Sequence, residues 1–161
     1  MRPRPFIPEK IVTDKNGLYV KDKPTGLIWH RCELRTLYID TDRSGTVYHS
    51  NYLRYFEFGR ACLMRDMAFP YIDIEKSGYV YPIIEINVLY HSPLQYDDPI
   101  YIHTRPSVLE KVRVRFDYLI THKDTGVIVC TGFSRHCATN TSGIPVAVDD
   151  KTVTLWKTFP K

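Results

Sequence analysis

The residues best suited to chemistry lie in one short segment, where a carboxylate precedes the expected start of a helix. Asp42 is followed by Gly45, whose missing side chain permits a tight turn, and then by His49–Asn51. The first backbone N–H groups of a helix lack partners within it and, with the partial positive charge of the helix end, can stabilise an oxyanion. Asp42 could attack a carbonyl carbon as a nucleophile or activate a water as a general base. The segment therefore predicts chemistry at a carbonyl.

The helix behind this carboxylate is the only strong helical pattern in the chain and runs from Ser50, a candidate N-cap, to about Ala68. Its apolar residues recur at steps of three and four, with charged residues on the other side. The apolar positions are Tyr52, Tyr55, Phe56, Gly59, Leu63 and Met67, and the charged ones are Arg54, Glu57, Arg60 and Arg65. Because the apolar arc covers about half of the circumference, we expect a deeply seated helix. Gly59, in the middle of that arc, predicts a close approach by another backbone.

Strand-like alternation precedes and follows the helix. The expected strands are Leu27–Ile39, Ile83–Tyr90, Ile100–Thr104, Val112–Thr121 and Val127–Ala138. Pro106 predicts a bulge or an edge. The chain is therefore predicted to be α+β, with one long central helix wrapped by a five- to six-stranded antiparallel sheet. Residues 1–26 are expected to form an N-terminal extension or hairpin, and residues 27–161 the domain.

Composition narrows the class of protein. The 161 residues, with 43% hydrophobic and 25% charged, suit one globular domain. The net charge of +4 is mild and its basic residues are scattered, so we expect no nucleic-acid partner, whereas a polyanionic small molecule fits equally well. The sequence shows neither a membrane-spanning run nor a signal peptide, so we expect no membrane association and a cytoplasmic location. The four cysteines share no CxxC spacing, so we expect reduced thiols and no metal site.

The segment around Asp42 resembles the signature of the 4-hydroxybenzoyl-CoA thioesterase family and of the related acyl-CoA thioesterases associated with the Tol-Pal system. That signature is an Asp-x-x-Gly-x-Val turn, an aromatic pair, and a helix with Asn/Ser-Tyr and Phe-Glu-x-x-Arg. The matching residues are Asp42 to Gly45, Val47, Tyr48-His49, Asn51-Tyr52 and Phe56 to Arg60. From residue 70 on, only the strand order and the turns agree.

The resemblance implies a hotdog fold and hydrolysis of an acyl-CoA or aryl-CoA thioester without a cofactor. It also implies that Asp42 is the catalytic aspartate and that the backbone N–H of His49 contacts the oxyanion, with the His49 side chain near the site. The resemblance further implies a homodimer or a homotetramer. The sheet independently favours a second copy, because one helix cannot cover so many strands.

Each candidate residue also has a structural interpretation. Asp42 could simply form a turn, and Asp40 is interpreted as structural. His49 is a catalytic or substrate-orienting residue, or a solvated one. Glu57 is expected to pair with Arg54 or Arg60, with a second catalytic carboxylate as the alternative.

The remaining candidates are contacts to the substrate. Gly45, Ser50, Asn51 and Glu57 are predicted to contact it at the turn and the helix start. Tyr48 and Tyr52, with Tyr55, are expected in the core, with an acyl pocket as the alternative. Arg113 and Arg115 form a solvated strand face or meet CoA phosphates.

Three other functions remain open. A hotdog hydratase or dehydratase acting on enoyl thioesters would pair Asp42 with His49. A carrier-protein thioesterase would use the scattered basic residues to receive an acidic carrier. A non-catalytic acyl-CoA-binding protein would keep the fold without turnover. The acyl group itself is open, whether aromatic, short or long.

Overall fold

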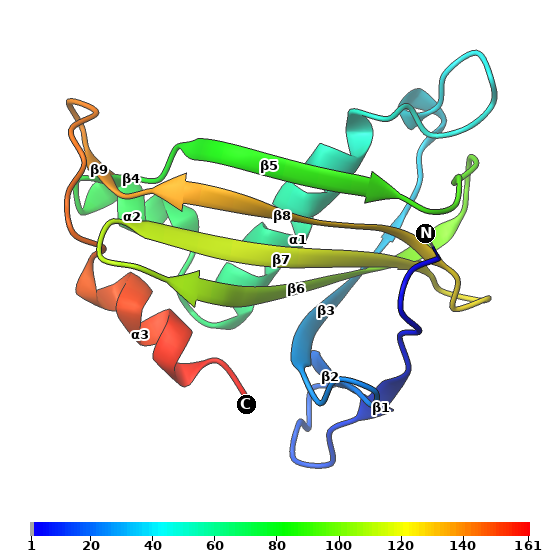
Figure 1. Cartoon of the computed structure of the whole chain (residues 1–161), viewed down its shortest axis with the longest axis horizontal. Helices are drawn as coiled ribbons and strands as arrows, with labels where there is room; N and C mark the ends of the chain where they lie inside the picture. Colours follow the sequence, from blue (N-terminus) through cyan, green and yellow to red (C-terminus); the bar gives the residue numbers. More distant parts are fainter. Residues whose placement is uncertain (1) are drawn as a thin grey trace.

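The computed structural model describes residues 2–161, in which a large antiparallel sheet carries one long helix across one of its faces (Figure 1). In chain order the elements are β1 (Pro8–Lys10), β2 (Tyr19–Asp22), β3 (Ile28–Arg35), the 3-10 turn η1 (Tyr38–Asp40), α1 (Asn51–Asp66), α2 (Tyr71–Lys76), β4 (Tyr79–Val80), β5 (Ile83–Tyr90), β6 (Pro99–Leu109), β7 (Arg113–His122), β8 (Ile128–Cys137), β9 (Thr139–Asn140) and α3 (Asp150–Thr158). Within this described part of the chain, no helix is both long and apolar enough to cross a membrane.

The main sheet has seven strands in the order β1-β2-β3-β6-β7-β8-β5, all paired antiparallel, and β4 and β9 form a separate pair. Its longest strands, β6, β7 and β8, form the centre, as two consecutive hairpins bring them together. The pairing of β6 with β7 shifts register between Pro106 and Val108, which confirms the bulge expected at Pro106. The α+β class is confirmed.

The helix α1 packs on β3, β6 and β7 through its apolar side. A Cβ atom on Gly59 would lie 2.5 Å from Cγ2 of Ile102 and 2.6 Å from Oγ1 of Thr104, both on β6. The missing side chain therefore lets the helix settle onto that strand, although the close contact is with side chains of β6. Near the end of α1, Asp66 bonds the fully buried His30 of β3 over 2.6 Å.

Three details of the predicted fold are wrong. The sheet has seven strands instead of five to six, because β1 and β2 continue it beyond β3. The first long strand ends at Arg35 instead of Ile39, because the side chain of Asp40 accepts a hydrogen bond from the N–H of Leu37 over 2.9 Å and turns the chain into η1. The short helix α2 also follows α1, where no helix was predicted.

The N-terminal segment forms the hairpin β1–β2, which is tied to the rest of the sheet. The buried Asp22 side chain accepts a hydrogen bond from the N–H of Ile7 over 3.0 Å. The ring of Phe6 packs 4.6 Å from that of His103 on the face opposite α1. The division into residues 1–26 and 27–161 stays a prediction.

The strand β5 forms one edge of the sheet and pairs only with β8 within residues 2–161. Its large apolar side chains are nevertheless exposed, namely Ile83, Ile84, Ile86, Leu89 and Tyr90. Val88 packs against the main core on the α1 side of the sheet, and strand alternation places Ile86 on the same side. An exposed edge with an apolar face is a surface that soluble proteins normally cover.

Candidate active site

Asp42 opens a tight turn between η1 and α1. The N–H of Asp42 donates to the carbonyl of Thr46 over 2.9 Å, and the N–H of Gly45 donates to the carbonyl of Asp42 over 3.0 Å. Gly45 has a φ of 80°, a left-handed conformation that glycine adopts without steric cost. Thr41 and Val47, on either side of the turn, pair as an antiparallel β-bridge. The turn therefore presents the Asp42 side chain from a closed backbone loop.

The Asp42 carboxylate is exposed and keeps one oxygen free. Oδ1 accepts hydrogen bonds from the Ser44 N–H, over 2.8 Å, and from the Ser44 hydroxyl. Oδ2 bonds no residue among 2–161. The Ser44 hydroxyl, then its backbone N–H, and the nearby charge of His49 lower the pKa of Asp42 below its ordinary value. Asp42 is therefore an anion at neutral pH with a free oxygen for a water or a carbonyl carbon.

The Ser44 hydroxyl gives a testable pH dependence. Ser44→Ala removes the hydroxyl hydrogen bond, which is the largest of the interactions that lower the pKa of Asp42. That pKa should therefore rise toward its ordinary value. If the reaction requires ionised Asp42, the acidic limb of the pH profile of kcat/KM should move to higher pH. Thr46→Ala, which removes a hydroxyl bonded to Ser44 instead of Asp42, is the matched control. Identical limbs in wild type and Ser44→Ala would contradict this role for the hydrogen bond.

The start of α1 leaves two backbone donors unengaged. The N–H groups of His49 and Ser50 bond no residue among 2–161, whereas the N–H of Asn51 donates to the carbonyl of Tyr48 over 2.9 Å. The N–H of Asn51 therefore has no partner within α1, as expected, but its bond to Tyr48 makes it unavailable to a ligand. Ser50 occupies the N-cap position, but its side chain makes no capping hydrogen bond. The Ser50 hydroxyl therefore does not accept a hydrogen bond from any of the first N–H groups of α1.

The backbone of His49 is held in place by a hydrogen bond from the last residue of the edge strand β5. Its carbonyl accepts a hydrogen bond from the Tyr90 hydroxyl over 2.7 Å, across 41 positions of sequence. The Tyr90 ring also packs edge-on against Tyr52, with centroids 5.2 Å apart. The exposed imidazole of His49 lies 4.2 Å from the Tyr48 ring. Sequence reasoning missed Tyr90, because no local pattern connects the end of β5 with the start of α1.

A shallow groove of about 300 Å³ opens beside these residues, and its walls include His49, Tyr52, Tyr90 and His91. The Nε2 atom of His91 bonds the Thr131 hydroxyl over 2.9 Å, and burial lowers the pKa of His91. His91 was likewise not predicted from the sequence. The groove gives a ligand direct access to the start of α1.

Asp40 organises this region from within, as its structural interpretation expects. Its buried carboxylate accepts hydrogen bonds from the hydroxyl of Tyr55 over 2.9 Å and from Arg54 over 3.1 Å. Its carbonyl accepts from the N–H of Tyr48 over 2.9 Å and from Nδ2 of Asn51 over 2.8 Å. Asp40 thus ties η1, the Asp42 turn and α1 together.

Removal of this carboxylate should destabilise the fold. In Asp40→Ala the buried Tyr55 hydroxyl and the Leu37 N–H lose their acceptor, so we expect the free energy of unfolding to fall by about 2–3 kcal/mol. Urea unfolding followed by tryptophan fluorescence measures the change. Asp124→Ala, at an exposed turn, should stay within about 0.5 kcal/mol of wild type. Equal stability of the two variants would refute the organising role of Asp40.

The other candidate residues are more dispersed. Tyr52 and Tyr55 are buried, which confirms their expected place in the core, whereas Tyr48 is 44% exposed and lies outside it. Glu57 is exposed and forms no ion pair among residues 2–161, because Arg54 pairs with Asp40 and Arg60 bonds the hydroxyl of Tyr118. The predicted helical ion pair of Glu57 is therefore wrong. Glu57 instead lines a cavity beside α1.

The two arginines of β7 lie away from the start of α1. Arg113 is exposed, and Arg115 is half-buried and bonds Asp117 over 2.7 Å. The guanidinium of Arg115 also lies 3.9 Å from the centroid of the Phe133 ring. These contacts favour the interpretation of Arg115 as part of the sheet surface.

Comparison with known proteins identifies the family to which the sequence is similar. A family model described as the Thioesterase-like superfamily matches residues 37–154. A Bacillus subtilis (strain 168) protein named "Putative acyl-CoA thioesterase YneP" is 43% identical over 72 residues, covering 45% of this chain and 52% of that protein. The chain thus spans about half the length of this relative. An Aquifex aeolicus (strain VF5) protein named "Putative esterase" is 32% identical over 103 residues, covering 64% of this chain and 79% of that protein.

A solved structure supports the same fold. The 1,4-dihydroxy-2-naphthoyl-CoA thioesterase Slr0204 from Synechocystis superposes with a TM-score of 0.75 at 14% identity, covering 80% of this chain and 96% of that chain. At this identity the likeness shows the fold alone. The hotdog architecture implied by the signature around Asp42 is confirmed.

Proposed function

This chain belongs to the thioesterase-like superfamily, and from this membership we propose that it hydrolyses the thioester of an acyl-CoA or aryl-CoA to a free acid and CoA. The observation that carries the proposal is the exposed, ionised carboxylate of Asp42, whose pKa the charge of His49 helps to lower, followed in the chain by the unengaged N–H groups of His49 and Ser50. The name of the Bacillus relative supports CoA as the thiol.

In the first form of the reaction Asp42 is a general base. Its free Oδ2 takes a proton from a water, and the oxygen of that water forms a bond to the thioester carbon. The carbonyl oxygen becomes an oxyanion and accepts hydrogen bonds from the N–H groups of His49 and Ser50. Collapse of this intermediate breaks the C–S bond and releases CoA as a thiolate. The second product is the free acid.

In the second form Asp42 is a nucleophile. Its carboxylate attacks the thioester carbon, CoA leaves as a thiolate, and the resulting acyl-aspartyl anhydride is hydrolysed by a water. Both forms use the same oxyanion donors. A thioester is the suitable substrate because its resonance is weaker than that of an ester, so a carboxylate and two donors can suffice. Neither form requires a metal or a cofactor.

The surrounding residues have supporting roles in this proposal. Tyr90 fixes the peptide between His49 and Ser50, because its hydroxyl bonds the carbonyl of that peptide. The donor of the same peptide, the N–H of Ser50, points away from Tyr90 and stays free for the oxyanion. The His49 imidazole, with Tyr48 beside it, is proposed to orient the substrate at the groove. Gly45 keeps the turn tight, and Asn51 holds it to α1.

We also propose that the working unit is a homodimer or a dimer of dimers. The unpaired edge of β5 and its exposed Ile86 suit pairing with the same strand of a second copy, which a two-fold axis makes antiparallel. Free thiols at the four cysteines and a CoA substrate suit a cytoplasmic enzyme. Residues 27–161 are proposed as the thioesterase domain and residues 1–26 as its extension.

Thiol release with a panel of benzoyl-, hydroxybenzoyl-, short-chain and long-chain acyl-CoAs tests the activity. Turnover of at least one class, with the acid and free CoA formed in equal amounts, is the expected result. Hydration of a 2-enoyl-CoA without thiol release would support the hydratase alternative instead. Binding without turnover of any substrate would favour a non-catalytic acyl-CoA-binding protein, and turnover of acyl-carrier protein alone would favour a carrier-protein thioesterase.

A further inference from the structure

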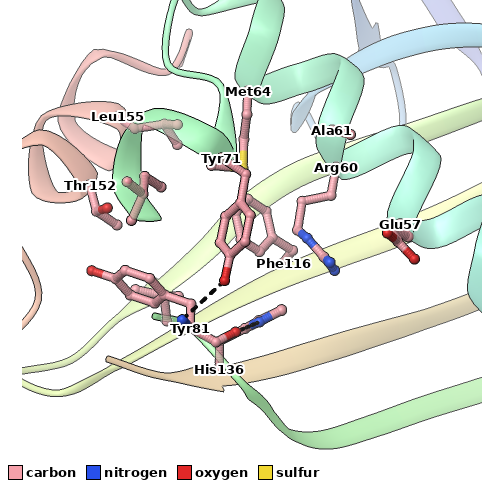
Figure 2. A pocket seen from close by; sticks show the side chains of 12 residues that line it. Glu57, Arg60, Ala61, Met64, Tyr71, Tyr81, Phe116, His136, Thr152 and Leu155 are labelled. Carbon is pink, nitrogen blue, oxygen red and sulfur yellow. Dashed lines mark hydrogen bonds between the residues drawn. The ribbon is translucent and has the colours of Figure 1, made fainter. Parts of the chain in front are cut away.

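A second, more enclosed space lies beside α1. This cavity of about 180 Å³ is bounded by α1, by the neighbouring parts of β7 and β8, and by α2 and α3 (Figure 2). Its walls are largely apolar and include Met64, Ile74, Phe116 and Leu155. Two side chains of α1 with formal charge, Glu57 and Arg60, line it as well. Such a mixture is typical of ligand sites, where apolar walls provide affinity and a few polar groups provide orientation.

Arg60 is held at the cavity by a chain of buried hydrogen bonds. Its Nη1 donates to the hydroxyl of Tyr118 over 3.1 Å, and that hydroxyl bonds the hydroxyl of Ser134 over 2.7 Å. Ser134 then bonds Nε2 of His136 over 2.8 Å, and Nδ1 of His136 bonds the carbonyl of Tyr81 over 3.0 Å. Tyr118, Ser134 and His136 are all buried. The chain therefore fixes the arginine from the interior of the sheet.

The direction of every hydrogen bond in this chain follows from its two ends. A carbonyl only accepts, so Nδ1 of His136 carries the proton. Burial, and then the charge of Arg60, lower the pKa of His136 to about 4, so its Nε2 accepts from Ser134 at neutral pH. Ser134 in turn accepts from Tyr118, and Tyr118 accepts from Arg60. Each group in the chain thus donates to the next, from Arg60 to the carbonyl of Tyr81. The positive charge stays on the guanidinium of Arg60.

This charge has no acidic partner in the described chain. Arg60 is half-buried, yet it forms no ion pair with any carboxylate among residues 2–161, and only one of its nitrogens bonds a protein group. Glu57, one turn nearer the start of α1, also forms no ion pair there. A partly desolvated guanidinium normally binds a carboxylate or phosphate. Here the remaining N–H groups are available to a ligand that enters the cavity.

We propose that this cavity binds the acyl part of the substrate and that Arg60 recognises a carboxylate at the far end of that acyl group. This inference rests on the proposed thioesterase activity and names its substrate class, the mono-CoA thioesters of dicarboxylic acids. Arg60 lies nine residues after the first residue of α1, about 13 Å along the helix axis. An extended acyl group that starts at the helix N-terminus and follows α1 therefore runs toward the cavity.

Substrate preference of the wild-type protein is the first test, because it requires no variant. The probes are octanoyl-CoA with suberoyl-CoA and dodecanoyl-CoA with dodecanedioyl-CoA, pairs that differ in the distal carboxylate and whose lengths bracket the distance along α1. We expect kcat/KM to be about 10- to 100-fold higher for at least one dicarboxylic member than for its neutral match. Hydrolysis of the neutral members with no preference for the acidic ones would overturn this inference and leave the proposed function standing. No hydrolysis of any acyl-CoA would overturn both.

Variants of Arg60 separate recognition from structure. Arg60→Met should remove most of the preference for the acidic substrate and leave kcat/KM for the neutral one within about threefold, whereas Arg60→Lys should retain part of the preference. Arg65→Met, on the same helix but outside the cavity, should change neither value. Glu57→Gln removes a negative charge from the cavity that would repel the carboxylate of the substrate. This variant should therefore raise the preference for the acidic substrate. An equal loss on both substrates in Arg60→Met, with Arg60→Lys unchanged on both, would assign Arg60 a structural role and overturn the proposal.

Discussion

Asp42→Asn is expected to lower kcat/KM for acyl-CoA hydrolysis by about 10²- to 10⁴-fold, whichever of the two reaction forms operates. The amide can neither take a proton from water nor attack the thioester carbon. Because the Asp42 side chain is exposed and its turn is closed by backbone hydrogen bonds, the variant should fold normally. Thiol release under pseudo-first-order conditions measures the rate, and thermal unfolding checks the fold.

Two controls make the Asp42 result specific. Asp124→Asn changes an exposed aspartate in the turn between β7 and β8 and should leave kcat/KM unchanged. Single-turnover experiments in H₂¹⁸O distinguish the general-base form from a nucleophile form in which water attacks the aspartyl carbonyl of the anhydride. In that nucleophile form ¹⁸O enters the Asp42 carboxylate, whereas in the general-base form it enters the free acid. Near-wild-type turnover in Asp42→Asn would remove Asp42 from the mechanism.

Ile86→Lys is expected to convert the proposed dimer to a monomer at micromolar concentration. Ile86 is 39% exposed on the edge strand β5, on the side of the sheet that carries α1. If two copies of β5 pair about a two-fold axis, the substitution brings two like charges to an apolar interface, where repulsion and desolvation both oppose association. Light scattering coupled to size-exclusion chromatography measures the mass.

The matched control for this prediction is Ile72→Lys, an equally radical change at a more exposed isoleucine on α2. It should keep the oligomeric state of the wild-type protein. A dimeric Ile86→Lys would place the interface elsewhere, and a monomeric wild-type protein would refute the proposed assembly.

The parts of the molecule that the sequence predicted well are those governed by local pattern. Period-two alternation identified β5, and helical periodicity identified the buried side of α1. The signature around Asp42 is also local, since the tight turn and the free N–H groups that follow it lie within ten residues. The separate role of Asp40 follows from the same segment, although its partners Arg54 and Tyr55 became evident only in the fold.

The parts that the sequence did not predict depend on contacts between distant segments. The predicted first strand was too long because the Asp40 side chain accepts a hydrogen bond from the N–H of Leu37 and ends the extended segment. The alternation of apolar and polar residues gives no sign of this hydrogen bond. The predicted helical ion pair of Glu57 with Arg54 does not form, because Arg54 pairs with Asp40, which lies outside the helix. The cavity beside α1 combines a helix with β7, β8 and the C-terminal helix α3, so no local pattern could reveal it.

The hydrogen bond from Tyr90 to the His49 carbonyl has a consequence for kinetics at low protein concentration. Tyr90 is the last residue of β5, so the strand proposed to meet a second copy also holds the peptide that offers an oxyanion donor. Pairing of two edges would stiffen that strand, whereas dissociation would leave it free to fray. The turnover rate per chain should then decline as the protein is diluted below the dissociation constant of the dimer. Plots of initial rate against enzyme concentration would curve upward from the origin instead of following a straight line.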